Sequence, residues 1–284
     1  MYAKNNHPPG LYLVATPIGN LSDMGQRALD ILRTADVIAC EDRRVTTKLL
    51  DHYDIKKPLI SYHEHNADRA GPDVIKRLQQ SQMVALVSDA GTPLLSDPGY
   101  KLVQSCIDAH IHLSAIPGPS SILMALVLSG LPTDRFYFHG FLPSKTTARQ
   151  KALFKLVPVP GSLVFLESPK RLAKSLADID QVLGSRQCAV SRELTKLYED
   201  VKRGSVSELA GYYSETGPPK GEITIVVGPA TKTTNISDAE IDQALKDAFR
   251  TLSTRDAVRQ VTSQFGLRKK TVYQRALLLE KQKP

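Results

Sequence analysis

Cysteine is scarce in this sequence, and its spacing excludes two common kinds of site. The 284 residues contain 3 cysteines, Cys40, Cys106 and Cys188, and none of them belongs to a CxxC pair. Zinc knuckles and disulfide frameworks both need cysteines at short or regular spacings. We therefore expect buried thiols, with neither a metal knuckle nor a disulfide.

Long apolar runs are also missing. No stretch approaches the roughly 20 apolar residues that a membrane-spanning helix needs. The opening residues, MYAKNNHPPG, contain no apolar core of signal-peptide length. The sequence therefore predicts a cytoplasmic protein that has no membrane partner.

The motifs of several large enzyme classes are absent. There is no GxGxxG after the first predicted strand, no GxxxxGK[ST], no GxSxG and no HExxH. These absences argue against nicotinamide-binding enzymes, nucleoside-triphosphate enzymes, serine hydrolases and zincins. His63 and His65 alternate on one face of a predicted strand, with Glu64 opposite, but no third ligand lies nearby. We therefore predict no metal site.

Positive charge is present but unevenly distributed. The chain has a net charge of +8, and residues 251–284 contribute +6 of it. A basic end on a near-neutral body is typical of a protein that binds a polyanion, most plausibly nucleic acid. A solvated helical surface would have the same composition, so charge leaves both interpretations open.

The apolar pattern predicts two folded domains of the α/β class. Strand and helix alternate five times between Leu11 and Ile116, which indicates a parallel sheet covered by helices. The run Pro117 to Ser121 then predicts a domain break, with Ser120 or Ser121 capping the next helix. Denser strands beyond it predict an α+β domain with a mixed sheet. The expected domains are 1–117 and 118–230.

The periodicity gives approximate bounds for each element. We expect strands at 11–15, 37–40, 59–62, 83–87, 111–116, 136–141, 163–167, 188–192, 198–203 and 222–227. We expect helices at 23–35, 43–52, 67–80, 100–109, 122–129, 147–156, 169–183 and 207–213.

The sequence pattern over residues 235–284 predicts a basic helical module. An amphipathic helix at 236–252 is followed by apolar positions at helical spacing over 254–265 and 269–279, with a turn at Gly266 between them. This is a helix-turn-helix pattern, which can lie on an RNA backbone, although many helical hairpins bind nothing. The candidate RNA contacts on it are Arg268, Lys269, Lys270 and Arg275.

One predicted strand leads into an unusually long loop. The stretch from Val84 to Gly99 reads VALVSDAGTPLLSDPG, in which an apolar run gives way to small and turn-forming residues. In open α/β sheets, ligands bind beyond the carboxyl ends of the strands. The loop is therefore a candidate binding edge, and a solvated connection is the alternative.

Charged clusters stand at the ends of other predicted strands. They are Glu41 to Arg44, Glu167 to Arg171, Arg192 to Lys196, and Lys220 to Glu222. Each pattern fits either a salt-bridged structural element or the edge of a substrate site. If the clusters face the loop after Asp89, a cleft between the domains would hold a cofactor and orient a substrate.

Nine short motifs, in this order, resemble the tetrapyrrole methylase superfamily, and within it the branch that modifies ribosomal RNA. They are LVATPIGNL, CEDRR, SYHEHN, VSDAGTPLLSDPG, PGPSS, HGFLPSK, FLESPKR, SRELTK and KGE. The resemblance runs from about Gly10 to Pro229, and the basic helical end also matches that branch.

The resemblance implies a two-domain methyltransferase that uses S-adenosylmethionine bound between its domains and is usually a homodimer. It implies 16S rRNA or the small ribosomal subunit as the partner, with a 2′-O-methylated cytidine in the decoding centre as the product. Carried over by motif, the cofactor contacts fall on Pro17, Asp89, Ala90, Gly91, Thr92, Leu95, Ser120, Ser121, Leu166, Glu167 and Leu194.

Thr92 departs from the tetrapyrrole-modifying members of the superfamily. Those members have a GGDP-type turn, whereas this chain has Ala90-Gly91-Thr92-Pro93 and lacks the acid. Backbone contacts to a cofactor survive such a change, because a tight turn presents its N–H and C=O groups whatever the side chain. The change weakens the case for a tetrapyrrole substrate.

A ribose hydroxyl is a poor nucleophile until its proton is removed or strongly hydrogen-bonded. The candidate bases or orienting groups are Glu41, Asp42, His63, Glu167 and Glu193. Further candidates for RNA contact are Arg44, Lys145, Arg171, Arg192, Lys196 and Lys220. We expect no single residue to be indispensable as a base, because positioning alone supplies much of the acceleration.

Two other functions stay open at this point. One is a small-molecule methyltransferase acting on a tetrapyrrole or corrinoid precursor, and the other is a non-catalytic nucleic-acid-binding protein. Calorimetry with S-adenosylmethionine separates the second of these from both methyltransferases.

Overall fold

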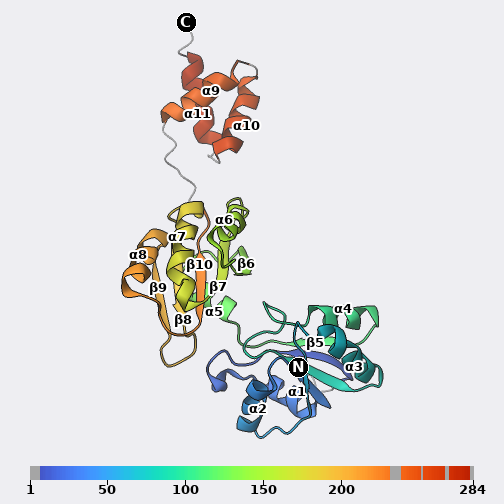
Figure 1. Ribbon diagram of the computed structural model, residues 1–284. Helices are drawn as coiled ribbons and strands as arrows, with labels where there is room; N and C mark the ends of the chain where they lie inside the picture. Colours follow the sequence, from blue (N-terminus) through green and yellow to red (C-terminus); the bar gives the residue numbers. More distant parts are fainter. Residues whose placement is uncertain (1–6, 231–237, 251, 266–268, 282–284) are drawn as a thin grey trace. The chain divides into compact units, whose positions relative to one another are not determined.

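The computed structural model describes residues 7–230, 238–250, 252–265 and 269–281. Contacts divide the chain into two compact units, 1–229 and 230–284 (Figure 1). The first unit contains two sheets, and the second is helical. No helix in the described ranges is both long and apolar enough to cross a bilayer.

The first sheet is entirely parallel, as predicted. Its strands, in spatial order, are β3 (Leu59–Ser61), β2 (Val37–Cys40), β4 (Met83–Val87), β1 (Gly10–Val14) and β5 (Leu113–Ile116). The helices that connect them are α1 (Gln26–Thr34), α2 (Arg43–His52), α3 (Ala67–Gln79) and α4 (Tyr100–Asp108).

Alternate residues of each strand enter two separate cores, one on each face of the first sheet. Ala85 and Val87 of β4 pack with the α1 and α2 side, whereas Val84 and Leu86 pack with the α3 and α4 side. All five residues of β4 are therefore buried. A central parallel strand covered on both faces has this continuous apolar character.

The second sheet is mixed, also as predicted. Its strands, in spatial order, are β6 (Phe136–Phe141), β7 (Ser162–Glu167), β10 (Ile223–Val227), β8 (Gln187–Arg192) and β9 (Asp200–Ser205). Only the β6–β7 pair is parallel among the pairs in this sheet. The helices α6 (Thr146–Phe154), α7 (Leu172–Leu183) and α8 (Val206–Thr216) contribute to one core.

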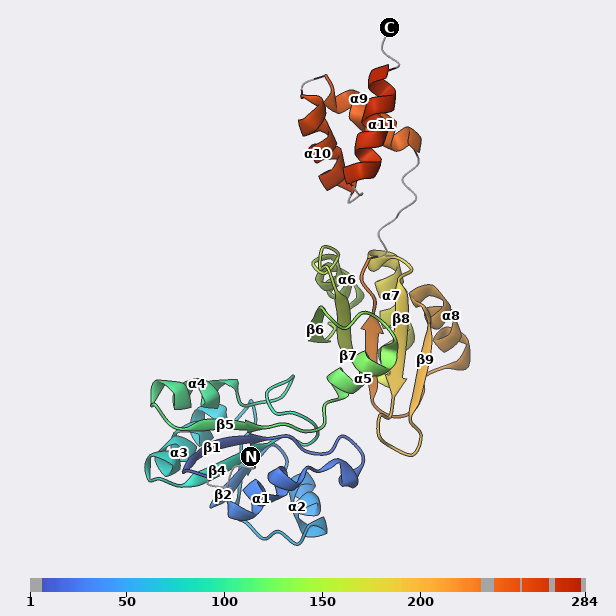
Figure 2. The same cartoon turned by 180° about the vertical axis from the view of Figure 1, so that it is seen from behind.

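Helix α5 (Ser121–Ser129) covers the other face of the second sheet (Figure 2). Ile122, Ala125 and Leu126 pack there against Val164 and Val226. Ser120 caps the helix by accepting a hydrogen bond from the Leu123 N–H at 3.4 Å. Ser120, at the end of the segment that follows β5, therefore fixes the start of α5.

Several expected boundaries are wrong for local reasons. The helix expected from Asp23 is a 3₁₀ turn, Leu21–Asp23, followed by α1, because Met24 and Gly25 have extended backbone. The strand expected at 198–203 lies at Asp200–Ser205. The helix expected from Pro169 starts as a 3₁₀ turn, Pro169–Arg171, and continues as α7.

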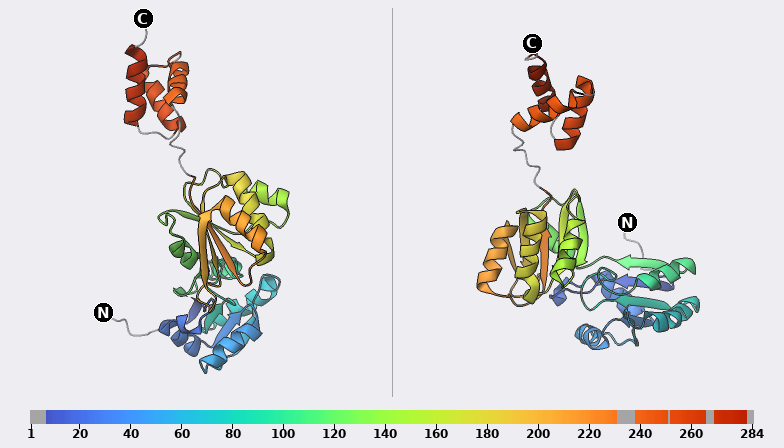
Figure 3. Two further views of the ribbon diagram at one scale, coloured as in Figure 1. Left: turned by 90° about the vertical axis from the view of Figure 1, so that its left-hand side faces the viewer. Right: turned by 45° about the horizontal axis from the view of Figure 1, so that its top comes forward.

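The second unit contains α9 (Asp238–Ala248), α10 (Thr254–Phe265) and α11 (Lys269–Lys281), the helices next to the C-terminal label in Figure 3. Their apolar faces form one core, with Leu245, Val261 and Val272 among its buried members. The expected helix pair is present, but the expected turn at Gly266 and the expected contact Arg268 lie outside the described residues.

The three cysteines are buried free thiols, as predicted.

Candidate functional site

The loop after β4 is held in a strained conformation. Leu94 and Ser96 have left-handed backbone, with φ of 74° and 69°. Such φ values are unfavourable for residues with a side chain and are concentrated at functional sites. The two left-handed residues flank Leu95, which is exposed, and Ser96 precedes Asp97, which is half-buried.

A backbone bridge joins this loop to the loop after β1. The Thr16 N–H donates to the Gly91 carbonyl at 2.9 Å, and the Gly91 N–H donates to the Thr16 carbonyl at 3.0 Å. Thr16 Oγ1 also donates to the Ser88 carbonyl. Gly91 has a φ of 82°, and a Cβ there would lie 3.3 Å from Ile18 Cγ2. Glycine at this position therefore provides both the turn and the close approach.

A third tie connects the loop to the start of α5. Thr92 Oγ1 donates a hydrogen bond to the Pro119 carbonyl at 3.2 Å. The threonine that replaces an acid in this turn therefore positions the amino end of α5, where the helix dipole favours a negatively charged group.

These segments enclose one side of a cavity of about 390 Å³. That volume falls within the roughly 300–1,000 Å³ range of small-molecule sites. Its other side comes from the ends of β6, β7 and β10 in the second sheet. The cavity is lined by Ile18, Ala90, Gly91, Thr92, Leu95, Ser96, Asp97, Ser120, Ser121, Ile122, Phe141, Leu166, Glu167, Ser168, Pro169, Gly221, Glu222 and Ile223.

Most of the expected cofactor contacts line this cavity. They are Ala90, Gly91, Thr92, Leu95, Ser120, Ser121, Leu166 and Glu167. Pro17, Asp89 and Leu194 are not in its lining. Leu194 is 6% exposed and packs in the core beneath α5, and the Asp89 carboxylate accepts a hydrogen bond from the Asp42 N–H at 3.1 Å.

Asp97 and Glu41 form an acidic edge with Asp42 and Asp89. Burial, and then the charge of Glu41, raise the pKa of Asp97 to about 6. Burial, followed by the charge of Asp89, also raises the pKa of Glu41. Asp42 behaves in the opposite way, because hydrogen bonds from the Arg44 side chain and backbone lower its pKa to about 2. Asp97 and Glu41 are therefore the carboxylates of this edge that are best suited to accept a proton near neutral pH.

The histidines expected on a strand lie in a turn instead. β3 ends at Ser61, and Asn66 closes the turn by accepting from the His63 N–H at 2.8 Å and donating to the Ser61 carbonyl at 2.9 Å. The strand expectation fails because the Asn66 side chain satisfies these backbone groups locally. Among the side chains that the structure describes, no cluster of three His, Cys, Asp or Glu is placed to hold a metal ion.

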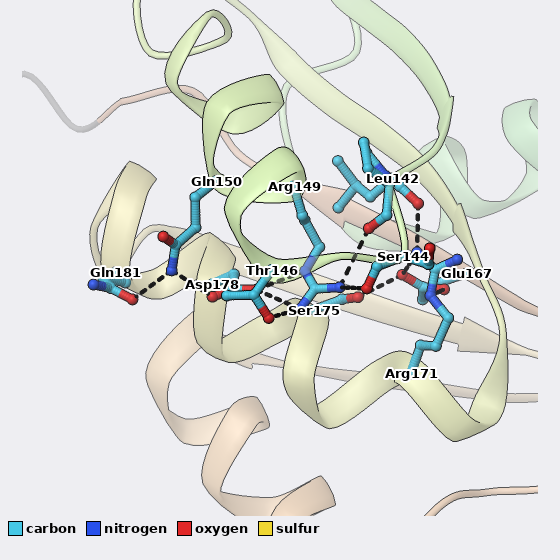
Figure 4. Close-up of polar contacts among 11 residues, drawn as sticks. Leu142, Ser144, Thr146, Arg149, Gln150, Glu167, Arg171, Ser175, Asp178 and Gln181 are labelled. Atoms are coloured by element: carbon cyan, nitrogen blue, oxygen red, sulfur yellow. Dashed lines mark hydrogen bonds and ion pairs between the residues drawn. The ribbon is translucent and has the colours of Figure 1, made fainter.

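Glu167, expected as a candidate base, is fully engaged by its neighbours (Figure 4). Its carboxylate accepts from the Ser168 N–H at 2.7 Å and from Ser175 Oγ at 2.5 Å. The Arg171 guanidinium pairs with both of its oxygens, at 3.1 and 3.2 Å. These donors occupy both oxygens of the carboxylate, so Glu167 forms a structural ion pair at the cavity wall.

Two guanidinium groups hold the segment that follows β6 (Figure 4). Arg171 donates to the Leu142 carbonyl, and Arg149 donates to the carbonyls of Pro143 and Ser144 at 3.3 and 3.0 Å. Arg149 is itself buried and paired with Asp178. This network fixes the backbone directly after Phe141, which lines the cavity.

Glu193 is likewise engaged. Its carboxylate accepts from the Glu222 N–H at 3.0 Å and from Lys196 Nζ at 2.9 Å, and these contacts lower its pKa. Lys196 also pairs with the Glu222 carboxylate at 3.2 Å. Its stem passes over Gly19, where a Cβ would lie 2.3 Å from Lys196 Cγ. The expected base and the expected RNA contact therefore form one ion-paired group.

Several other cations expected to contact RNA already have partners. Arg44 pairs with Asp42 at 2.7 Å, and Arg192 Nη1 donates to the Lys220 carbonyl at 3.5 Å. On α11, Arg275 pairs with Asp238 and Asp242. Lys145, Lys220 and Lys270 are exposed, and the Lys269 side chain is not described.

The lining residues that the sequence did not indicate are mainly apolar or come from distant segments. Ile18, Ile122 and Phe141 carry no chemical signature. Gly221 has a φ of 99°, and a Cβ there would lie 2.3 Å from the Glu193 side chain. Gly221 and Glu222 were indicated by the sequence, as part of the cluster Lys220 to Glu222.

Comparisons with known proteins give one consistent result. Residues 10–210 match the family model Tetrapyrrole (Corrin/Porphyrin) Methylases, and residues 235–280 match the model RsmI C-terminal HTH domain. The chain is 48% identical over 273 residues to Ribosomal RNA small subunit methyltransferase I of Mesorhizobium japonicum, covering 96% of this chain and 92% of that protein. It is 40% identical to the protein of the same name from Escherichia coli O157:H7, covering 96% of each.

Solved structures share the fold of the first unit. Diphthine synthase has a TM-score of 0.59 at 14% identity, over 77% of this chain and 89% of that one. A uroporphyrin-III C-methyltransferase from Thermus thermophilus, complexed with S-adenosyl homocysteine, has a TM-score of 0.53 at 18% identity, over 77% of this chain and 97% of that one.

Proposed function

The chain belongs to the tetrapyrrole methylase family, within the group of ribosomal RNA small subunit methyltransferase I, and we propose that it methylates the ribose 2′-oxygen of a cytidine in the decoding centre of 16S rRNA. It is an S-adenosylmethionine-dependent methyltransferase of small-subunit ribosomal RNA. We propose the identity of the methylated nucleotide, the methylation of its 2′-oxygen, and a cytoplasmic location for the protein.

The observation that supports the proposal best is the cavity between the strained loop after β4 and the end of the second sheet. Ala90 to Thr92, Leu95, Ser120 and Leu166 would hold S-adenosylmethionine. The site fits that molecule because its walls are largely apolar, because Gly91 leaves the space that a Cβ would fill, and because the amino end of α5 suits a carboxylate. When bound, the cofactor supplies a methyl group on a positively charged sulfur.

The proton of the ribose hydroxyl passes to the acidic edge in this proposal. Asp97 lines the cavity, and Glu41 lies close enough to raise its pKa. Either carboxylate would accept the proton as the oxygen attacks, so each partly replaces the other. We expect Asp97→Asn and Glu41→Gln to lower kcat about tenfold each, and their combination to cost about 10² to 10⁴-fold.

Mapping of 2′-O-methylated riboses in small-subunit rRNA, from cells with and without the gene, tests the proposed function. We expect one cytidine of the decoding centre to lose its methyl group in the deletion strain and to regain it on complementation. An unchanged methylation map would contradict the proposal. Tight binding of a porphyrinoid without RNA retention would instead favour a small-molecule substrate.

We also propose that the protein is a homodimer that buries the outward face of α5. Leu123, Met124 and Val127 of this helix are 47%, 40% and 66% exposed, and the edge strand β6 of the same sheet exposes Phe136 and Tyr137. Large apolar side chains gathered on an exposed helix face mark protein interfaces. We expect Val127→Glu to shift the sedimentation coefficient from dimer to monomer, and Val127→Ala to leave it unchanged. A wild-type chain that sediments as a monomer would refute the dimer.

A further inference from the structure

A polar groove of about 610 Å³ runs between the edge strand β3 and helix α3. In the described sheet, β3 pairs only with β2, so its other edge borders the groove. The strand contributes Ile60 and Ser61, and the remaining lining comes from α3 and its ends: Asn66, Arg69, Ala70, Asp73, Lys76, Arg77 and Gln80.

The groove carries a net positive charge on one helix face. Arg69, Asp73, Lys76 and Gln80 are spaced so that they share a face of α3. Arg69 and Lys76 are exposed, and neither forms an ion pair within the part of the chain that the structure describes. They lie about 10 Å apart along the helix axis. Asp73 is the single acid in the lining.

The groove begins beside the acidic edge. Asn66, which lines it, also closes the turn that contains His63. The charge of His63 acts in turn on Glu41. The turn that contains His63 therefore connects the surroundings of Glu41 to Arg69, the first cation of α3.

Electrostatics requires such a neighbour. Glu41, Asp42, Asp89 and Asp97 repel the phosphates that flank any ribose entering the cavity, and this repulsion has to be offset nearby. Arg44, Arg171 and Lys196 are already paired with carboxylates of the chain, whereas Lys145 and Lys220 of the second-sheet domain are exposed. Beside the acidic edge of the first sheet, Arg69 and Lys76 add two further cations that form no ion pair among the described residues.

We propose that the β3–α3 groove binds the phosphate backbone of single-stranded RNA flanking the target nucleotide. This inference rests on the proposed rRNA substrate. Sequence-specific enzymes reach single-stranded RNA segments, and grooves of positive charge track their backbones. Arg69 and Lys76 each contact a phosphate, and Asp73 weakens the binding.

The test measures binding of a fluorescein-labelled single-stranded RNA of the decoding-centre sequence to the full chain, by anisotropy at several salt concentrations. We expect Arg69→Ala/Lys76→Ala to weaken binding about tenfold and to reduce the slope of log K against log salt by about 1.4, the value for two phosphates of a single strand. We expect Asp73→Asn to tighten binding severalfold, because it removes the one acid.

The matched control is Lys155→Ala/Lys174→Ala, two exposed cations of which one directly follows α6 and the other lies on α7. This variant should bind RNA like the wild type, and calorimetry should give all variants the same affinity for S-adenosylhomocysteine.

If the wild type binds RNA but Arg69→Ala/Lys76→Ala shows the same affinity and the same salt slope, the proposed role of the groove is overturned and the proposed function is not. No binding by the wild type to this RNA or to the assembled small subunit would overturn the proposed function as well. A defect seen only with assembled small subunits, and not with RNA, would assign the groove to a ribosomal protein and also overturn the proposal.

Discussion

At the scale of the residue, neighbouring groups divide the carboxylates of the cavity edge into two kinds. Arg44 donors hold Asp42 ionised, whereas burial and mutual repulsion raise the pKa of Asp97 and Glu41. Glu193 belongs with Asp42, because contacts with the Glu222 N–H and with Lys196 lower its pKa. The same carboxylate group therefore suits proton acceptance at Asp97 and Glu41 and ion pairing at Asp42 and Glu193.

The raised pKa of Asp97 makes stability depend on pH. A folded pKa of about 6, above the ordinary value of 3.8, means that the folded state binds the proton more tightly than the unfolded state. The resulting stabilisation is fully present below about pH 4 and is lost as the pH rises through 6. We expect Asp97→Asn to gain about 1–2 kcal/mol over the wild type between pH 4 and 7.5, a value reduced for partial solvent exposure.

Urea unfolding of both proteins at several pH values measures this difference. Asp73→Asn is the control, since Asp73 lies on the exposed face of α3. Parallel stability curves for Asp97→Asn and the wild type would show that Asp97 has an ordinary pKa.

At the scale of the element, two cations of α11 have different surroundings: one is ion-paired with the neighbouring helix α9, and the other is exposed to solvent. Arg275 pairs with Asp238 and Asp242 and so fastens α11 to α9, whereas Lys270 is exposed. The sequence predicted that both contact RNA. It predicted the helices correctly from apolar periodicity, but it carried no information about which acid of a neighbouring helix each cation would meet.

Substitution of the two cations should therefore have different effects. We expect Arg275→Ala to lower the melting temperature of the helical module, because the substitution leaves Asp238 and Asp242 without their ion-pair partner. We expect Lys270→Ala to leave the melting temperature unchanged and to weaken RNA binding about threefold through one lost phosphate contact. Circular dichroism and RNA anisotropy measure the two effects. Equal losses of RNA affinity at constant stability would show that Arg275 is available to RNA.

Strands and helices could be predicted because their apolar residues repeat with period two or with helical spacing. The errors arose where polar side chains or backbone angles act locally. Asn66 ended β3 early, and extended backbone at Met24 and Gly25 separated a 3₁₀ turn from α1. Such effects involve one or two residues and leave no periodic signal.

At the scale of the whole molecule, the chain consists of a two-sheet body and a helical module, with contacts dividing at 229/230. The strained loop could be predicted as half of the site, because turn-forming residues after a buried strand are visible in the sequence. The other half comes from the ends of β6, β7 and β10. The charged clusters at Glu167 to Arg171 and Lys220 to Glu222 indicated part of it, whereas the apolar Phe141 and Ile223 carry no local pattern that marks them as lining residues.

Removal of residues 230–284 tests which unit binds the cofactor and which contributes to RNA binding. We expect the body to keep its melting temperature and its affinity for S-adenosylmethionine, because its cores contain no residue of the module. RNA binding should weaken, with a flatter salt dependence, since the module carries most of the excess positive charge. Loss of cofactor affinity in the truncated chain would mean that the module supports the cavity.

The bridge between Thr16 and Gly91 has a mechanical consequence. Two reciprocal backbone hydrogen bonds make the loops after β1 and β4 move as one rigid block, and Thr92 extends that block to the first turn of α5. The opposite wall is held by side chains instead, because Arg171 and Arg149 hold the segment after Phe141 and Glu193 accepts from the Glu222 N–H next to Gly221. One wall of the cavity is therefore braced by main-chain hydrogen bonds and the other by side-chain contacts.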